Sequence, residues 1–558
     1  MKMGNRLRNP NAWRNDSAVG KSSVKGKSPS PALLLYLLGL IFFPLMIGGC
    51  ATVGPDFKTP EAEVAEEWQE EQDSKIRSDN RDDRDWWKAF NDPVLDNLVE
   101  SAYQQNLPLQ KAGIRIFEAR AQLAIAIGSQ YPQKQQFTGQ ASVNQISQSG
   151  TNFDFLSRNF DLYSIGFDAA WELDFFGKFR RGVESAGANL IATVANYDDL
   201  LVTLTAEVAR AYVLNGTIEE RLAVSRENVA IQQRSLQLTE VRFKYGDVTE
   251  LDVQQARALL TDTQAKIPRL EAQLRQAKNG LSILLGIPPG DFRGLLDGEE
   301  RIPSPPSEVA IGIPADLLRR RPDIRRAQLQ AAAQSARIGV AKADIYPSFA
   351  LFGSIGLGAL TNGSGATASD LFSNDSLNYS AGGGFQWPFF NYGRIRNNVR
   401  VQDARFQELI VEYQNTVLEA AREVEDSLVG FLRAQEEEKY LENSVVALKR
   451  AVEISLIQYR EGEVDYQRVI DNQRFLTSQQ DQLASTSGNV NLNLIAMYKA
   501  LGGGWQIREG NEFVSEEIIQ VMQERTNWGN LIKRTQLPER MEQPPTGQEV
   551  KLFNKPSW

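Results

Sequence analysis

Four stretches of this chain alternate apolar and polar residues with a period of two, which is the pattern of half-buried β-strands. They are Phe137–Val143, Tyr163–Leu173, Phe349–Leu357 and Leu377–Phe389, with Phe352 interrupting the polar face of the third. Aromatic residues gather near the strand ends, as they do at a membrane interface. The pattern predicts two β-hairpins, at about 135–175 and about 347–390, with strands long enough to cross a membrane as part of a barrel.

A second pattern shows that the chain repeats itself. Asn106–Pro132 and Arg321–Pro347 align without a gap at a constant shift of 215 positions. Both copies are alanine-rich, helical in pattern, and end in a Tyr-Pro pair directly before a predicted strand. A duplicated helix-and-strand unit indicates a chain built from two similar halves. We therefore divide its body into a first repeat, residues 86–300, and a second, residues 301–505.

Long helices are predicted after each hairpin, because Val183–Ile267 and Arg394–Trp505 contain no proline. Gly246 and Gly462 interrupt them at related positions, which predicts two antiparallel helix pairs joined by turns. A helix of about 60 residues spans roughly 90 Å. These helices are too polar to lie in lipid, so we expect them to extend into water and to pack as coiled coils.

Four strands cannot close a membrane barrel, because the smallest such barrels have about eight. An open sheet edge cannot lie in lipid, since its backbone groups would lack hydrogen-bond partners. If the hairpins are in a membrane, several chains must share one barrel, and two or three copies would supply eight or twelve strands. The alternative is a small soluble sheet, which does not explain Asp168, Glu172 and Asp174 along one face of a strand whose other face is apolar.

The amino-terminal segment resembles an export signal. Residues 2–27 are basic and polar, Ala32–Ile47 is apolar, and Gly48-Gly49-Cys50 follows. This order predicts a cleaved signal peptide over residues 1–49, with a transmembrane anchor as the alternative. We expect residues 50–85, which are acidic and broken, to form a surface wrap or linker.

Composition narrows the range of functions. The chain has 558 residues, no histidine and a single cysteine, so an internal disulfide is excluded and the commonest metal ligand and general base are missing. Residues 1–49 carry seven Lys or Arg and one acidic residue, so the remainder has a net charge of −15. An acidic body argues against a nucleic-acid partner. We expect neither an enzyme nor a metal site.

Six stretches together resemble TolC-type outer membrane factors, in the lipid-anchored branch that serves drug and metal efflux pumps. They are Cys50–Pro60, Trp86–Leu98, Asp174–Arg181, Ile313–Ile324, Trp387–Arg396 and Ala500–Trp505. The resemblance implies an α+β membrane protein that forms a homotrimer. Each chain would give four strands to a shared twelve-stranded β-barrel and long helices to a periplasmic α-barrel. An equatorial belt is expected from the segments near 287–315 and 433–444 and from the polar tail, residues 506–558, in which a helix is expected at Glu516–Glu524.

The same resemblance implies location and function. Cys50 would carry diacylglycerol and an N-acyl chain, anchor the protein in outer membrane lipid, and be the only modified group, with no other cofactor. The protein would conduct small molecules or ions passively from an inner-membrane efflux pump and a periplasmic adaptor to the exterior. Two alternatives remain at this stage: an outer membrane duct for type I protein secretion, and a coiled-coil adaptor lipoprotein that conducts nothing.

A periplasmic gate is expected at the helix turns, whose tips are Gly246 and Gly462. By resemblance, Asp471 occupies the place of the constriction aspartate, and copies from several chains would form a carboxylate ring that attracts cations. The alternative is that Asp471 lies on an ordinary solvated helix face. Arg468 would pair with a neighbouring carboxylate and lock the closed state, and opening would untwist the inner helix pair. The full set of expected gate residues is Asp471, Gln467, Arg468, Asp465, Asp252 and Glu250.

Overall fold

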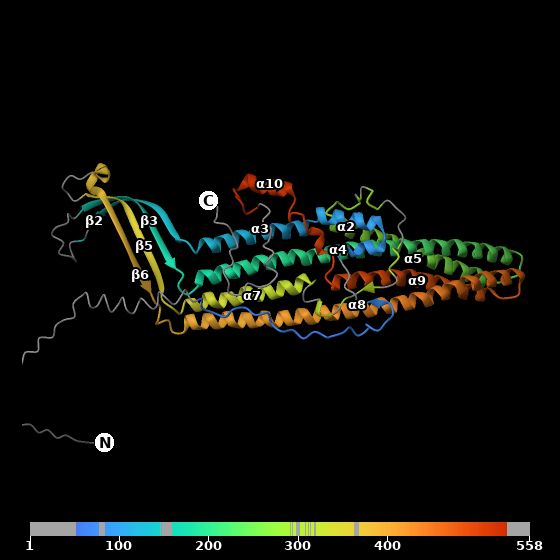
Figure 1. Ribbon diagram of the computed structural model, residues 1–558. Coiled ribbons are helices and arrows are strands. Elements are labelled where there is room, and N and C mark those ends of the chain that lie inside the picture. Colours follow the sequence, from blue (N-terminus) through green and yellow to red (C-terminus); the bar gives the residue numbers. More distant parts are fainter. Residues whose placement is uncertain are drawn as a thin grey trace, which may run out of the picture. The chain divides into compact units, whose positions relative to one another are not determined.

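The computed structural model describes residues 52–532 except 78–83, 146, 148–158, 291, 293, 297–301, 307–308, 311, 313, 317–319 and 362–367. The predicted signal peptide, Cys50 and the end of the tail lie outside the described residues. Within the described unit, a four-stranded sheet lies at one end of a set of long helices, and the two helix turns lie at the other (Figure 1).

The repeat predicted from the sequence is confirmed element by element. Helices α3 (Leu107–Gly128) and α7 (Pro322–Ala343) are related by the shift of 215 at both of their ends. Helices α5 (Glu250–Leu284) and α9 (Tyr466–Ala500) are related in the same way at a shift of 216. Each half therefore folds into the same succession of helix, hairpin and helix pair.

The helix pairs are less symmetric than we predicted. The first members, α4 (Lys178–Lys244) and α8 (Arg394–Glu461), have 67 and 68 residues, whereas α5 and α9 have 35 each. Both short helices end before a glycine with positive φ, Gly286 at 69° and Gly502 at 74°. Glycine adopts this left-handed conformation without a steric penalty and ends a helix efficiently. Pro268, where the predicted uninterrupted stretch stopped, lies inside α5.

The shorter helices α3 and α7 pack along the part of the long helices that α5 and α9 do not reach. Helix α3 packs on α4, and α7 packs on both α4 and α8. The long helices α4 and α8 are thus accompanied by α3 and α7 toward the sheet and by α5 and α9 toward the helix turns. Helix α2 (Pro93–Gln105) precedes α3 and also packs on α4.

The two hairpins form one antiparallel sheet in the order β2-β3-β5-β6, joined through β3 and β5. The strands are β2 (Lys134–Gln145), β3 (Asn159–Leu173), β5 (Ser348–Thr361) and β6 (Leu377–Gln386). Strand β6 is shorter than predicted, because its last residue pairs with Ser348, where β5 begins. Beyond that position it has no partner strand.

Register places like residues side by side across the sheet. One row joins Phe137, Phe167, Ile355 and Tyr379, all of them exposed. The adjacent row on the other face joins Gln136, Asp168, Ser354 and Ser380. Paired residues in an antiparallel ladder point to the same face. The sheet therefore has one apolar and one polar face, and both are open in the single chain.

Phe352 lies on the polar face, where the sequence pattern was interrupted. Its ring covers two glycines of β6, since a Cβ added at Gly382 or Gly384 would lie 3.0 or 3.6 Å from it. The aromatic ring thus fills the space that the missing side chains of the neighbouring strand leave. It supports the sheet locally and does not break the strand.

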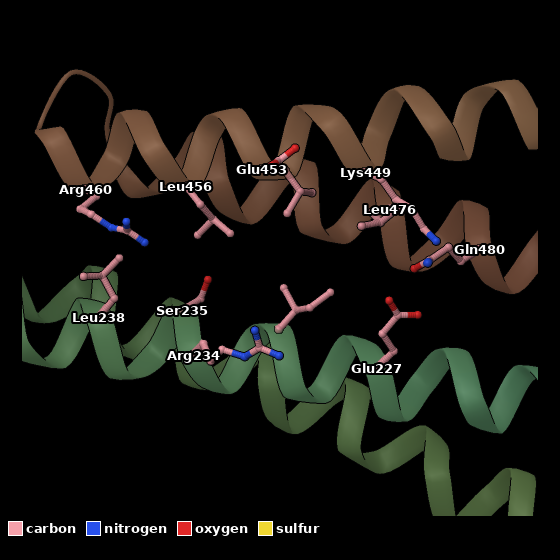
Figure 2. A pocket seen from close by; sticks show the side chains of 12 residues that line it. Glu227, Arg234, Ser235, Leu238, Lys449, Glu453, Leu456, Arg460, Leu476 and Gln480 are labelled. Carbon is pink, nitrogen blue, oxygen red and sulfur yellow. The ribbon is translucent and has the colours of Figure 1, made fainter.

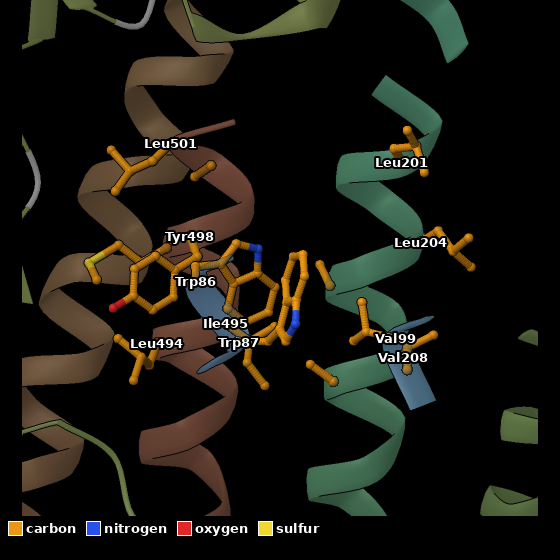
Figure 3. Close-up of a cluster of buried hydrophobic side chains, with 14 of the residues drawn as sticks. Trp86, Trp87, Val99, Leu201, Leu204, Val208, Leu494, Ile495, Tyr498 and Leu501 are labelled. Atoms are coloured by element: carbon orange, nitrogen blue, oxygen red, sulfur yellow. The ribbon is translucent and has the colours of Figure 1, made fainter. Parts of the chain in front are cut away.

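The largest core lies at mid-length and is built around two adjacent tryptophans in the 3-10 helix η1 (Trp86–Phe90). Trp86 and Trp87 insert between α4 and α9, and Trp86 stacks on Tyr498 with ring centroids 5.2 Å apart (Figure 3). Short 3-10 helices occur elsewhere, at η2 (Pro314–Asp316), η3 (Ala368–Phe372), η4 (Asn374–Ser376) and η5 (Trp505–Arg508).

The segment before η1, which we predicted to be a surface wrap or linker, packs along the helices in its described part. Phe57 is buried against Phe406 of α8, and the indole N–H of Trp68 donates to the carbonyl oxygen of Gly312 at 3.0 Å. Strand β1 (Ile76–Arg77) pairs with β4 (Val309–Ala310) in parallel.

The described part of the tail is also packed. Helix α10 (Glu516–Arg525) matches the prediction of a helix at Glu516–Glu524. With the residues around it, α10 covers Phe117 of α3 through Val514, Met522 and Ile532. One segment of the expected belt, near 433–444, lies inside α8. This helix continues without a break to Glu461.

A close approach of α4 and α9 provides a stability test. A Cβ added at Gly488 of α9 would lie 2.3 Å from the Thr217 hydroxyl oxygen of α4, which is buried and already bonded to the backbone. We expect Gly488→Ala to lower the free energy of unfolding by about 1–3 kcal/mol, the usual cost of overpacking. Urea unfolding followed by circular dichroism measures it.

The control is Gly280→Ala in α5, where an added Cβ meets nothing within 4 Å. Alanine is about 0.8–1 kcal/mol more favourable than glycine inside an exposed helix, so this variant is expected to be more stable than the parent. Equal stabilisation by both substitutions would show that the α4–α9 contact yields without cost.

Candidate functional site

The end of the unit opposite the sheet is formed by the turns between α4 and α5 and between α8 and α9 (Figure 1). Gly246 and Gly462 lie in these turns with φ of 83° and 80°, as predicted for helix-ending glycines. The N–H of Asp247 donates to Arg242 O at 3.0 Å, and that of Glu463 donates to Gln458 O at 2.9 Å. Both turns thus close in the same way, and we refer to this end as the tip.

Two of the predicted gate carboxylates begin helices. Asp252 accepts hydrogen bonds from the backbone N–H and the hydroxyl of Thr249, at 2.9 and 2.8 Å, in a capping box at the start of α5. Asp465 accepts from the backbone N–H of Arg468 at 3.3 Å at the start of α9. An acidic side chain in the first turn also complements the helix dipole. Both residues add negative charge at the tip and fix its backbone.

The tip has its own apolar core. Tyr459 of α8 and Tyr466 of α9 are buried, with ring centroids 5.1 Å apart, and Leu259 of α5 packs beside them. Burial raises the pKa of Tyr466 to about 12. Because residues of three helices share this core, the tip is held in one defined arrangement.

Sequence reasoning missed the residue that ties the helix pairs together at the tip. Arg242, in the last turn of α4, donates a hydrogen bond to the carbonyl oxygen of Tyr459 in α8. Its guanidinium also lies 4.8 Å from the centre of the Tyr459 ring. The only sequence signal was a basic residue just before a predicted helix end. Its partner is 217 positions away in sequence, so the contact itself had no local signature.

Asp471 and Gln467 are brought together as the helical spacing implied. The amide nitrogen of Gln467 donates to the Asp471 carboxylate at 2.9 Å, and the amide nitrogen of Gln255 of α5 donates to Gln467 at 3.4 Å. Asp471 is half-buried and Gln467 is exposed. This chain of hydrogen bonds orients the carboxylate and links α9 to α5.

The remaining predicted gate residues, Glu250 and Arg468, make few side-chain contacts. Glu250 accepts a hydrogen bond from Gln254 within the first turn of α5, at 3.5 Å. Arg468 is exposed, and no ion pair of its side chain is found within the described part of one chain. The predicted Arg468 lock is therefore not made inside a single chain, where Arg242 makes the corresponding tie.

Toward the tip, beyond the apolar core around Trp86, the contact between α4 and α9 is polar. The amide nitrogen of Asn228 donates to Gln480 at 2.8 Å, and that of Gln473 donates to Ser235 at 2.7 Å, both in buried positions. Arg221 pairs with Asp481 at 2.8 Å nearby. Such a seam has a defined geometry but buries little apolar surface, so separating it loses less hydrophobic stabilisation than separating an apolar interface would.

A groove of about 420 Å³ separates α4 from α8 near the tip (Figure 2). Leu476 and Gln480 of α9 contribute to its lining, together with Leu238 of α4 and Leu456 of α8. Helix α9 therefore lies behind the gap, as its floor. Asp471 points roughly 160° away from this floor at 3.6 residues per turn, on the opposite side of α9.

Across the described part of the chain, no three Asp, Glu, His or Cys side chains are grouped as metal ligands would be. In the same residues, no helix combines the length and apolar character needed to cross a bilayer. The site thus consists of polar helix surface, a carboxylate held by glutamines, and a tip fixed by aromatic packing.

Comparison with known proteins gives one consistent result. Residues 98–287 and 313–503 match the family described as outer membrane efflux protein, one match for each repeat. The chain is 32% identical over 443 residues to the pyoverdine export outer membrane protein OpmQ of Pseudomonas putida, covering 79% of this chain and 92% of the relative. It is 30% identical over 474 residues to nodulation protein T of Rhizobium leguminosarum, covering 84% and 94%.

Among solved structures, the outer-membrane channel OprN superposes with a TM-score of 0.76 at 32% identity. The match covers 82% of this chain and 100% of that one.

Proposed function

This chain belongs to the outer membrane efflux protein family, and from that premise we propose that three copies form one channel, which conducts small molecules or ions passively from a periplasmic adaptor and an inner-membrane pump to the exterior. The protein is an outer membrane channel of an efflux system. The single observation that carries the proposal is a sheet that is incomplete in one chain, with an apolar face and two unpaired edges.

The directions of the two edge strands of the sheet support a shared barrel. Strands β2 and β6 are the two edges of an antiparallel sheet of four strands. The β6 edge of one copy and the β2 edge of the next run antiparallel when copies are placed side by side, so the hydrogen-bond pattern continues. Three copies then give a closed barrel of twelve strands, and the row of Phe137, Phe167, Ile355 and Tyr379 faces lipid.

The conduction path runs from the tip, along the helices, to the polar face of the sheet. The tip, with Asp471, is the periplasmic entrance, and the polar face of the sheet lines the exit. Three Asp471 carboxylates, each held by Gln467, form a ring that favours cations at the entrance. The polar α4–α9 contact near the tip allows α9 to shift against α4 when the channel opens, because separating it exposes little apolar surface. The upstream pump selects the cargo.

Cys50 carries the lipid anchor in this proposal. Labelled palmitate is expected to be incorporated into the parent chain and to be lost completely in Cys50→Ser, as measured by autoradiography of the purified protein. Incorporation that is equal in both chains contradicts the anchor at Cys50. A single acyl chain binds a membrane weakly, whereas the several chains expected on Cys50 anchor the protein together with the barrel.

The channel is tested with the purified, detergent-extracted protein. We expect the mass of a trimer and discrete, cation-preferring current steps in a planar lipid bilayer. A closed tip also gives silence, so the Asp471→Ala variant is measured beside the parent. If both are silent, and if the protein becomes a soluble monomer once Cys50 is removed, the channel proposal is wrong and a non-conducting adaptor lipoprotein explains the chain better.

A further inference from the structure

Phe475 is a large apolar residue on the otherwise polar exposed surface of α9. The side chain of this residue is 62% exposed, although phenylalanine is normally buried. The other exposed residues of α9 are polar or small: Gln467, Arg468, Arg474, Ser478, Gln482, Asn489 and Ala496. A large apolar side chain at one position of an otherwise polar stripe requires an explanation that the fold of one chain does not provide.

The position of Phe475 follows from its spacing to Asp471. Residues four apart on a helix lie on the same face, and the rise between them is about 6 Å. Helix α9 starts at the tip with Tyr466, so Phe475 lies one turn further into the unit than Asp471. Cargo that enters at the tip meets the carboxylate first and the phenyl ring next.

The direction of Phe475 is set by the packing of α9. Leu476 and Gln480 form the floor of the groove between α4 and α8, and Phe475 points roughly 120° away from them at 3.6 residues per turn. Phe475 therefore shares the face of Asp471, opposite the groove. If Asp471 faces the axis of the trimer, Phe475 faces it as well.

We propose that the Phe475 side chains of three copies form an apolar collar one helical turn behind the Asp471 ring, and that this collar seals the closed tip against hydrated ions. The inference rests on the proposed function, because the collar exists only in the trimer. An apolar constriction blocks ions by excluding water, since an ion cannot shed its hydration shell there without replacement ligands. The two rings then have separate effects: Asp471 sets which sign of ion enters, and Phe475 sets how much passes while the tip is closed.

The side chain of Phe475 is not needed for the fold of one chain. In one chain Phe475 is exposed and contributes little to any core. Leu476, directly beside it, is fully buried against Val445 and Val452 of α8 and holds α9 in place. A change at Phe475 should therefore leave the helix pair intact and alter only the surface that the three copies share.

The test compares Phe475→Ser with Phe475→Leu in planar bilayers. We expect Phe475→Ser to raise the resting ionic current several-fold while the cation-to-anion permeability ratio stays as in the parent. Phe475→Leu keeps an apolar ring and is expected to retain a low resting current. The control is Val521→Ser, which makes a similar apolar-to-polar change at an exposed position of α10 and is expected to change neither quantity.

The outcomes separate this inference from the proposed function. An unchanged resting current in Phe475→Ser, in a protein that conducts, overturns the collar and leaves the channel in place. Equal leakage through Phe475→Leu and Phe475→Ser overturns the apolar seal as its mechanism. Dissociation of the Phe475→Ser trimer, seen by native mass spectrometry, shows a subunit contact and overturns the collar. A parent protein that is monomeric and never conducts removes the channel itself.

Discussion

Replacing Arg508 by alanine is expected to lower the free energy of unfolding by about 3–5 kcal/mol, the cost of leaving one partner of a buried ion pair without the other. Two guanidinium nitrogens of Arg508 in η5 donate to the two carboxylate oxygens of Asp198 in α4. The bond from Nη2 is 2.9 Å long. The Asp198 side chain is only 5% exposed. The pair fixes the tail against α4, and without Arg508 the buried carboxylate loses its principal partner.

The pH dependence of this variant follows from the same carboxylate. Burial raises the pKa of Asp198, although Arg508 counteracts the rise. A group whose folded-state pKa is raised contributes stability below its unfolded pKa and loses it as pH rises through the folded value. We therefore expect the deficit of Arg508→Ala to shrink on acidification, because the protonated Asp198 carries no charge.

The matched control is Arg450→Ala. Arg450 pairs with Glu453 at 2.6 Å, but both side chains are more than 60% exposed. A surface pair of this kind contributes about 0.2–1 kcal/mol. Urea unfolding at neutral and acidic pH gives the free energy of unfolding of the parent, Arg508→Ala and Arg450→Ala. Equal losses for the two variants at neutral pH would contradict the role assigned to burial.

The second large effect is expected at the tip. In the proposed trimer, Asp471→Asn keeps the size of the side chain and removes three negative charges, so the cation-to-anion permeability ratio should fall several-fold toward one. In the proposed trimer the three carboxylates lie close together around the path of the ion, and electrostatic attraction is strongest at short distance. Reversal potentials in a salt gradient across a planar bilayer give the ratio.

Glu271→Gln is the control for net charge. Glu271 of α5 pairs with Arg226 of α4 at 3.0 Å on an exposed surface. Its position is 19 residues beyond Asp252, or about 28 Å along the helix. This substitution removes the same charge far from the tip and should leave the ratio unchanged. An Asp471→Asn channel with the parent's ratio would assign Asp471 to a solvated helix face.

Local signals predicted much of the architecture. The Tyr-Pro pairs marked where α3 and α7 hand over to strands, and the period-two alternation located all four strands of the sheet. Gly246 and Gly462 marked the turns, because a left-handed residue after a helix is nearly always glycine. The carboxylate and amide at Asp471 and Gln467 were expected together, since helical spacing alone places them on one face.

Other features depend on contacts that have no local signature. Helices α5 and α9 have 35 residues each, shorter than the roughly 60 predicted for a long helix, and α5 continues through Pro268. The Arg242–Tyr459 tie and the Arg508–Asp198 pair join residues 217 and 310 positions apart. Charged residues are common on every helix here, and only the packing of helices selects which of them become partners.

The sequence by itself determined the repeat, the kinds of element and their order, because periodicity, proline and glycine act on the backbone within a few residues. The tertiary structure decided how the two halves combine: that β3 pairs with β5, that α9 packs on both α4 and α8, and that the face of α9 with Asp471 and Phe475 lies opposite the groove. These relations follow from burying one face of each element against another, which no single segment specifies.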